Sequence, residues 1–176
     1  MDPSRLVYLD ETGAKTNMTR LFARAKKGDR AVDHAPQGHW NTTTLVAAIT
    51  RESTIAPMVL DGPMDGAAFQ VYVERVLLPA LPASGAIVVM DNLSAHKSPV
   101  IARLIEGAGS EIRYLPPYSP DLNPIEPMWS KVKSFLRGAK TRTQEELWSA
   151  IAQALAQITP SDTWGFFCHR GVGMIS

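Results

Sequence analysis

Residues 86–90 constrain the fold of this chain more than any other segment. Their sequence, Ala-Ile-Val-Val-Met, is apolar without interruption and rich in β-branched side chains. Such a run indicates a strand that is covered on both faces, as in a sheet with helices on either side. The run ends at Asp91 and Asn92. The sequence therefore predicts a buried strand whose end carries polar side chains.

The other segments predict early strands, followed by helices that alternate with strands. Residues 6–9 form a second apolar run that ends on an acid, Asp10, and residues 42–50 and 55–60 have the pattern of a hairpin. Later patterns predict helices over residues 66–78, 99–107, 124–136 and 143–158, and a strand over residues 111–115. This order indicates an α/β fold, with a mixed sheet of about five strands and helices on both faces.

Length and composition suit one globular domain. The chain has 176 residues, of which 45% are hydrophobic, and we expect a core over residues 5–158 and a C-terminal tail over residues 159–176. No run approaches the roughly 20 apolar residues of a membrane span, and the first residues do not resemble a signal peptide, so we expect an intracellular protein. Cys168 is the single cysteine, which excludes an intrachain disulfide and a cysteine zinc cluster. We expect the four tryptophans to be core anchors: Trp40, Trp129, Trp148 and Trp164.

Three acids are candidate catalytic and metal-binding residues. Asp10 and Asp91 each end an apolar strand, and functional sites in such sheets gather at strand ends. Glu126 lies in the first turn of the helix that follows a proline-rich connector. If the first and fourth strands are neighbours and this helix packs beside them, the three carboxylates converge.

Converging carboxylates favour a bound cation. Two of them about 4 Å apart repel by roughly 4 kcal/mol at an effective dielectric of 20. Oxygen ligands suit Mg²⁺, which keeps part of its water shell. Two such ions would activate an attacking water or 3′-hydroxyl and stabilise the leaving oxygen of a phosphodiester.

Each acid also has an ordinary structural interpretation. Asp10 and Asp91 are residue types that occur in turns. Asn123 and Glu126 have capping-box spacing, so Glu126 can instead serve its own helix terminus. The interpretation of the three acids as one site rests on their positions. Each acid stands at the end of its predicted element, and a stiff connector precedes Glu126.

The net charge is only +1, which is weak evidence for a nucleic-acid partner. The distribution of the basic residues along the chain is more informative. Lys131, Lys133 and Arg137 follow Glu126 in a stretch that has no acid between Pro127 and Gln144. On a helix, Lys133 and Arg137 share a face with Glu126 and are placed to contact DNA phosphates. A solvated helix face is the alternative, as it is for the second basic run in residues 20–30. Five residues are candidates for DNA binding: Asn92, His96, Lys131, Lys133 and Arg137.

Three segments carry a resemblance to a known family. They are residues 8–13 (Tyr-Leu-Asp-Glu-Thr-Gly), residues 88–96 (Val-Val-Met-Asp-Asn-Leu-Ser-Ala-His) and residues 115–126 (Leu-Pro-Pro-Tyr-Ser-Pro-Asp-Leu-Asn-Pro-Ile-Glu). They resemble the three catalytic blocks of mariner-like DDE transposases, most closely the bacterial insertion-sequence branch. The 34 residues between Asp91 and Glu126 are typical of that group.

The resemblance implies an RNase H-like fold with two divalent ions, Mg²⁺ or Mn²⁺, held by Asp10, Asp91 and Glu126. It further implies DNA cleavage and transfer of a 3′-hydroxyl to target DNA, by a bacterial, nucleoid-associated protein of the cytoplasm. The implied partners are transposon-end DNA, target DNA and a second copy of the chain.

Full-length members of this family carry a helix-turn-helix region before the first catalytic strand. Here Asp10 is reached within ten residues, so we expect a separately encoded or frameshift-joined portion to recognise the element ends, unless the chain is a remnant. Two other functions stay open. One is an RNase H-like nuclease without strand transfer, and the other is an inactive DNA-binding or regulatory product.

Overall fold

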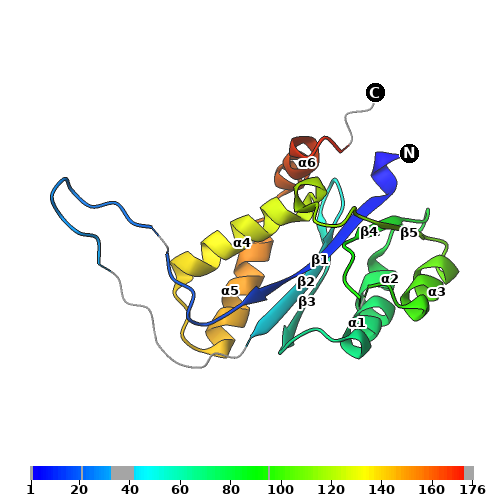
Figure 1. Cartoon of the computed structure of the whole chain (residues 1–176), viewed down its shortest axis with the longest axis horizontal. Helices are drawn as coiled ribbons and strands as arrows, with labels where there is room; N and C mark the ends of the chain where they lie inside the picture. The colour runs from blue at the N-terminus through cyan, green and yellow to red at the C-terminus, as the bar shows by residue number, and fades with distance from the viewer. Residues whose placement is uncertain (1, 21, 33–41, 95, 173–176) are drawn as a thin grey trace.

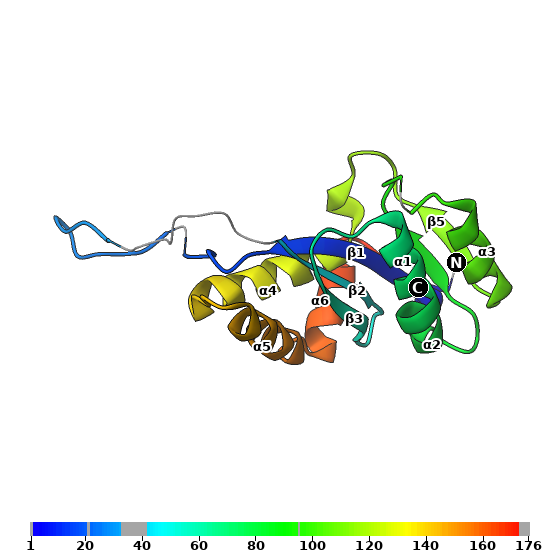
Figure 2. The ribbon, with the colours of Figure 1, turned by 90° about the horizontal axis from the view of Figure 1, so that it is seen from below.

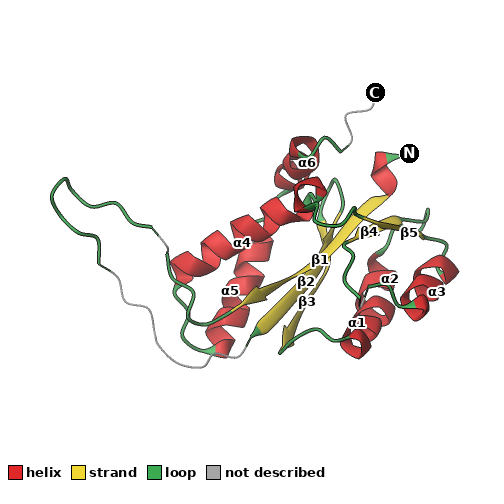
Figure 3. Cartoon of the chain, viewed as in Figure 1, coloured by secondary structure: helices red, strands yellow, loops and turns green. Residues whose placement is uncertain are grey.

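A mixed five-stranded sheet is the centre of the structure, a computed structural model that describes residues 2–20, 22–32, 42–94 and 96–172 (Figures 1 and 3). The strand order is β3-β2-β1-β4-β5. Antiparallel pairing joins β1 to β2 and β2 to β3, whereas β4 is parallel to both β1 and β5. The strands are β1 (Leu6–Ala14), β2 (Thr43–Ile49), β3 (Thr54–Asp61), β4 (Ile87–Met90) and β5 (Glu111–Tyr114). The predicted α/β architecture with an RNase H-like fold is confirmed.

Helices cover both faces of this sheet, as Figure 2 shows from below. Alternate residues of β1 point to opposite sides: Leu6 and Tyr8 join one core cluster, and Val7 and Leu9 the other. The cluster around Tyr8 includes α4 (Ile125–Ala139), α5 (Gln144–Ala156) and α6 (Pro160–His169). The opposite cluster includes α1 (Gly66–Tyr72), a π-helical segment (Val73–Leu77) and α3 (Pro99–Gly107), and α2 (Leu78–Ala80) continues the π-helical segment. Every residue of β2 and β4 is buried, which is the physical reason for their apolar sequences.

The predicted elements lie where the sequence places them, with shifted ends. The helix predicted over residues 66–78 is one helical stretch to Ala80, interrupted by the π-helical segment. The helix after the proline-rich connector extends to Ala139 and ends at Lys140, which has a left-handed backbone with φ of 50°. That conformation stops the helix, since left-handed residues commonly follow helix C-termini.

The segment predicted as a C-terminal tail contains a packed helix, α6. A capping box formed by Thr159 and Asp162 starts it, and Pro160 occupies its first turn. Thr163 and Phe167 are one helical turn apart and both are buried. Phe167 packs edge-on against Tyr8 of β1, with ring centroids 5.4 Å apart. The prediction of a tail is corrected. The signals that start α6 are local in the sequence, whereas the packing of Phe167 on Tyr8 is made across the fold.

The described residues between β1 and β2 reach away from the body of the molecule (Figure 1). Residues 15–20 and 22–32 contain neither helix nor strand, and the basic residues among them are exposed. Of the tryptophans, Trp129 is buried as predicted, whereas Trp148 and Trp164 are 43% and 42% exposed, and Trp40 lies outside the described residues. Within the described part of the chain, no helix has the length and apolar character needed to cross a bilayer.

Candidate active site

Asp10 and Asp91 come from neighbouring parallel strands. The register pairs Tyr8 of β1 with Val89 of β4, and continuing it by two residues brings Asp10 beside Asp91. β4 ends at Met90, whereas β1 continues to Ala14 while paired with β2. Beyond that point the edge of β1 is free of β4, and the two carboxylates lie at this opening. Asp10 therefore lies within β1. The sequence predicted it at the end of that strand, and this position is corrected.

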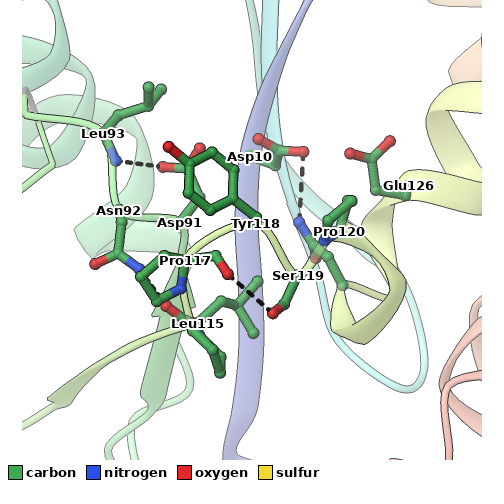
Figure 4. Close-up of a pocket in the computed structure, with 12 residues that line it drawn as sticks. Asp10, Asp91, Asn92, Leu93, Leu115, Pro117, Tyr118, Ser119, Pro120 and Glu126 are labelled. Atoms are coloured by element: carbon green, nitrogen blue, oxygen red, sulfur yellow. Dashed lines mark hydrogen bonds between the residues drawn. The ribbon is translucent and has the colours of Figure 1, made fainter.

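Glu126 completes the group from the start of α4. All three acids line one cavity of about 480 Å³, together with the turn after β4 and the connector that leads to α4. Figure 4 shows the three carboxylates around the opening, with the ring of Tyr118 at its margin. The structure thus brings together the three acids that the sequence singled out from distant segments.

Asp10 is a buried carboxylate held by three donors. Its Oδ1 accepts a hydrogen bond from the amide of Glu11 at 2.8 Å. Its Oδ2 accepts from the indole of Trp129 at 3.3 Å and from the amide side chain of Asn123 at 3.5 Å. Burial, followed by the charges of Glu126 and Asp91, raises the pKa of Asp10 to about 7, although the bonds from Glu11 and Trp129 oppose this rise. Asp10 therefore binds a proton more readily than an ordinary aspartate does.

Asp91 has the opposite tendency. Its Oδ1 lies 2.6 Å from Nδ1 of His96 and accepts the amide N–H of Leu93 at 3.0 Å. Partial burial opposes its ionisation, but the bonds from His96 and Leu93 and the nearby positive charge outweigh this and lower the pKa of Asp91. His96 is itself buried against Phe69, with ring centroids 4.4 Å apart. Asp91 is thereby kept ionised and fixed in orientation.

Glu126 does not serve as the cap of its own helix. The N-cap of α4 is Pro124, and no side-chain capping bond forms there. The backbone amide of Ile125 is instead satisfied by Oδ1 of Asn123 at 3.3 Å. Glu126 is left facing the cavity from the first turn of α4, where the helix dipole favours a negative charge. The capping-box alternative is not the arrangement seen.

The residues present fit a divalent cation of the magnesium type. No three His, Cys, Asp or Glu side chains in the described ranges are already arranged as a finished metal site. Mg²⁺ does not require one, since it commonly binds through one or two carboxylates, water and substrate phosphate oxygens. Burial makes the largest contribution to the raised pKa of Asp10, and the charges of Glu126 and Asp91 add to it. A cation among the acids relieves the repulsion between their charges.

The candidates for DNA binding fall into separate places. Asn92 lines the cavity and donates to the carbonyl of Leu115, which ties the turn after β4 to the connector. His96 has a side chain that is 2% exposed and contacts Asp91, so it is enclosed by the protein. Lys131 bonds Asp162 at 2.7 Å and the carbonyl of Gln157 at 3.2 Å.

Lys133 and Arg137 are both partly exposed on α4. The helical rise places them about 10 Å and 16 Å from Glu126 along the axis of α4. They are outside the residues that line the cavity. A role in DNA binding stays a prediction for both.

Two residues that hold Asp10 were not recognised from the sequence. Trp129 was predicted as a core anchor and Asn123 as a helix cap, yet each also donates to Oδ2 of Asp10. Their spacing of six residues in one helical region gives no signal that both reach β1. Glu11 is a further acid close to the site: burial raises its pKa, and one carboxylate oxygen is enclosed without a hydrogen-bond partner among the described residues.

Solved structures with a similar fold include complexes and a catalytic domain of the Mos1 transposase. A pre-cleavage Mos1 transpososome superposes with a TM-score of 0.78 at 18% identity, covering 96% of this chain and 53% of that one. The mariner Mos1 paired-end complex with Mg gives 0.77 at 20% identity, over 96% and 52%. The Mos1 catalytic domain alone gives 0.70 at 17% identity, over 96% and 78%. The chain spans about half the length of the proteins in the first two, and identities this low establish the fold alone.

Sequence comparison adds the family. No curated protein sequence matches the chain at a significant level. The family profile described as a DDE superfamily endonuclease matches residues 5–148, a range that contains Asp10, Asp91 and Glu126 and most of the chain. This chain therefore belongs to the DDE superfamily of endonucleases.

Proposed function

We propose that this chain is the catalytic domain of a DNA transposase of the mariner-like superfamily, from its bacterial insertion-sequence branch. It cleaves phosphodiesters at transposon ends and transfers the 3′-hydroxyl into target DNA. One observation carries the proposal: Asp10, Asp91 and Glu126, from β1, the end of β4 and the start of α4, line one open cavity. The fold shared with the Mos1 strand transfer complex, at a TM-score of 0.74, supports it.

Asp10, Asp91 and Glu126 would hold the divalent ions, Mg²⁺ or Mn²⁺ and two in number. Solved mariner Mos1 complexes contain Mg or Mn, which supports this choice. When bound, such ions activate the attacking oxygen and stabilise the leaving oxygen of a phosphodiester.

The protein's own groups prepare the three carboxylates in different ways. Trp129 and Asn123 hold Oδ2 of Asp10, so the position of this buried carboxylate is set before DNA arrives. His96 occupies Oδ1 of Asp91, which leaves Oδ2 as the oxygen with no hydrogen-bond partner among the described residues. Glu126 is presented by a helix whose first turn stabilises its charge. Preorganisation of this kind lowers the cost of positioning at the moment of reaction.

The partners follow from the same proposal. Transposon-end DNA and target DNA would occupy the cavity in turn, with the chain acting as a homodimer. A helix-turn-helix portion, encoded separately or joined by frameshifting, would recognise the ends. The Mos1 transpososome and the Mos1 paired-end complex share this fold, which supports assembly on paired DNA ends.

The decisive experiment incubates the protein with labelled duplex DNA and Mg²⁺ or Mn²⁺, and follows cleavage. A second substrate with a pre-cut 3′-hydroxyl end tests for products joined to target DNA. We expect both reactions from the wild type and neither from Asp91→Asn. Asp61→Asn is the matched control, because Asp61 is an exposed acid at the end of β3.

The outcomes separate the functions. Cleavage without joined products assigns a nuclease that lacks strand transfer. DNA binding without any metal-dependent cleavage assigns a regulatory DNA-binding product. Cleavage at the wild-type rate by Asp91→Asn removes this residue from the reaction and contradicts the proposed mechanism.

A further inference from the structure

We propose that Arg170 and His169, at the end of α6, bind the backbone phosphate of DNA next to the phosphate held in the active-site cavity. The inference rests on the proposed function, since it requires DNA in that cavity. A second groove adjoins the cavity and has a volume of about 690 Å³. Glu126 and Pro120 line both hollows, and His169 and Arg170 line the groove only. A strand that leaves the cavity past Glu126 therefore enters this groove.

Helix α6 is firmly placed beside the start of α4, as Figure 1 shows. The hydroxyl of Thr163 donates to the carbonyl of Arg51 at 3.1 Å, and Phe167 is fully buried against Tyr8. Lys131 of α4 forms an ion pair with Asp162 at 2.7 Å. These contacts determine where the last turn of α6 lies, and α6 falls outside the range of the family match.

The guanidinium of Arg170 has no ion-pair partner within the described part of the protein. Its Nε is enclosed and has no hydrogen-bond partner there. No ion pair within 4 Å joins Arg170 to a described acid, although Glu126 and Asp121 line the same groove. The enclosed Nε shows that the side chain is packed in place, which reduces the entropy lost when a ligand binds.

Arginine is the side chain best suited to a phosphate. Its planar guanidinium presents several N–H donors that match two phosphate oxygens, and it stays charged at all relevant pH values. The exposed imidazole of His169 and the hydroxyl of Ser130, which also lines the groove, add further hydrogen-bonding groups. A DNA backbone phosphate accepts hydrogen bonds from such donors. The divalent ions proposed for the acidic cluster would hold the neighbouring phosphate.

A purely structural role for Arg170 is the competing explanation. Cations near a helix C-terminus interact favourably with the helix dipole, and Arg170 directly follows α6. That role predicts a loss of stability without a change in DNA binding. The two explanations therefore differ in a measurable quantity.

The test measures the affinity of the full chain for a short labelled DNA duplex in EDTA, from 50 to 500 mM salt. Each phosphate contact contributes about 0.9 to the slope of log affinity against log salt. We expect Arg170→Gln to lower the slope by about this amount, so that its affinity deficit shrinks about eightfold across the range. Arg170→Lys should retain the slope. Arg103→Gln is the matched control, because Arg103 is exposed on α3, which packs against the opposite face of the sheet.

Two readouts keep the inference separate from the proposed function. Thermal unfolding of each variant detects a structural role, and metal-dependent cleavage by the wild type tests the proposed function by itself. An Arg170→Gln slope equal to that of the wild type overturns the phosphate site, even if the wild type cleaves DNA. A wild type that neither binds nor cleaves DNA overturns both.

Discussion

Replacing Asp10 with asparagine tests how much free energy the protein stores in its active site. The pKa of this buried carboxyl rises from 3.8 to about 7, which corresponds to about 4 kcal/mol between the two protonation states. A raised pKa means that the folded state binds the proton more tightly than the unfolded state. This stabilisation is complete below about pH 4 and is lost as the pH rises through 7.

The wild type is therefore expected to lose up to about 4 kcal/mol of unfolding free energy, relative to Asp10→Asn, between pH 4 and pH 8. The two proteins are compared by how their unfolding free energies change with pH, not by the absolute values. The asparagine cannot accept from Glu11, Trp129 and Asn123 together, so the variant also carries a constant offset. Urea unfolding in EDTA across this pH range measures the difference, and Asp61→Asn controls for the removal of an exposed acid.

Divalent ions provide the second half of the same experiment. At pH 8 and a concentration one hundred times the dissociation constant, Mg²⁺ or Mn²⁺ should stabilise the wild type by about 2.7 kcal/mol. Asp10→Asn should gain much less, because it lacks one of the proposed ligands. Parallel pH profiles of the wild type and the variant, together with equal gains from the metal, would refute the reasoning from Asp10.

Three further changes address the surroundings of the acids. His96→Ala removes the hydrogen bond that lowers the pKa of Asp91, so the acid side of the pH–rate profile for cleavage should move to higher pH, while DNA affinity measured in EDTA stays the same. Trp129→Phe keeps a ring in the core but removes the bond to Asp10. Urea unfolding of this variant should show a loss of about 1.5–3 kcal/mol of unfolding free energy above pH 7. The loss should be smaller below pH 5, where Asp10 is protonated. Lys133→Ala combined with Arg137→Ala should weaken DNA binding mainly at low salt, and an unchanged affinity there would identify that face of α4 as merely solvated.

Local patterns were sufficient for most elements. The apolar run at residues 86–90 became β4, buried along its whole length, because a strand without polar positions has no face to offer to water. The capping box at Thr143 starts α5. The helix α6 was missed although Thr159, Pro160 and Asp162 are local start signals. Only the contact between Phe167 and Tyr8 shows where that helix packs.

The candidate site divides in the same way. The residue types, the ends of two apolar runs and the stiff connector before Glu126 pointed to the three acids, although Asp10 lies within β1. The spacing gave no sign that Trp129 and Asn123 hold Asp10, nor that His96 is enclosed against Phe69. Such contacts depend on side-chain directions at sequence separations above 100 residues in the case of Asp10.

The sequence by itself indicated most strands and helices in their order along the chain, and the three candidate acids, because hydrophobic period and turn chemistry act between near neighbours in the chain. Only the tertiary structure decided which carboxylate is costly to ionise and which is easy. Burial and partner distance set those energies. Both depend on the packed sheet, in which β1 lies beside β4 and α4 crosses one face. The segments that contain Asp10 and Asp91 do not show them in isolation.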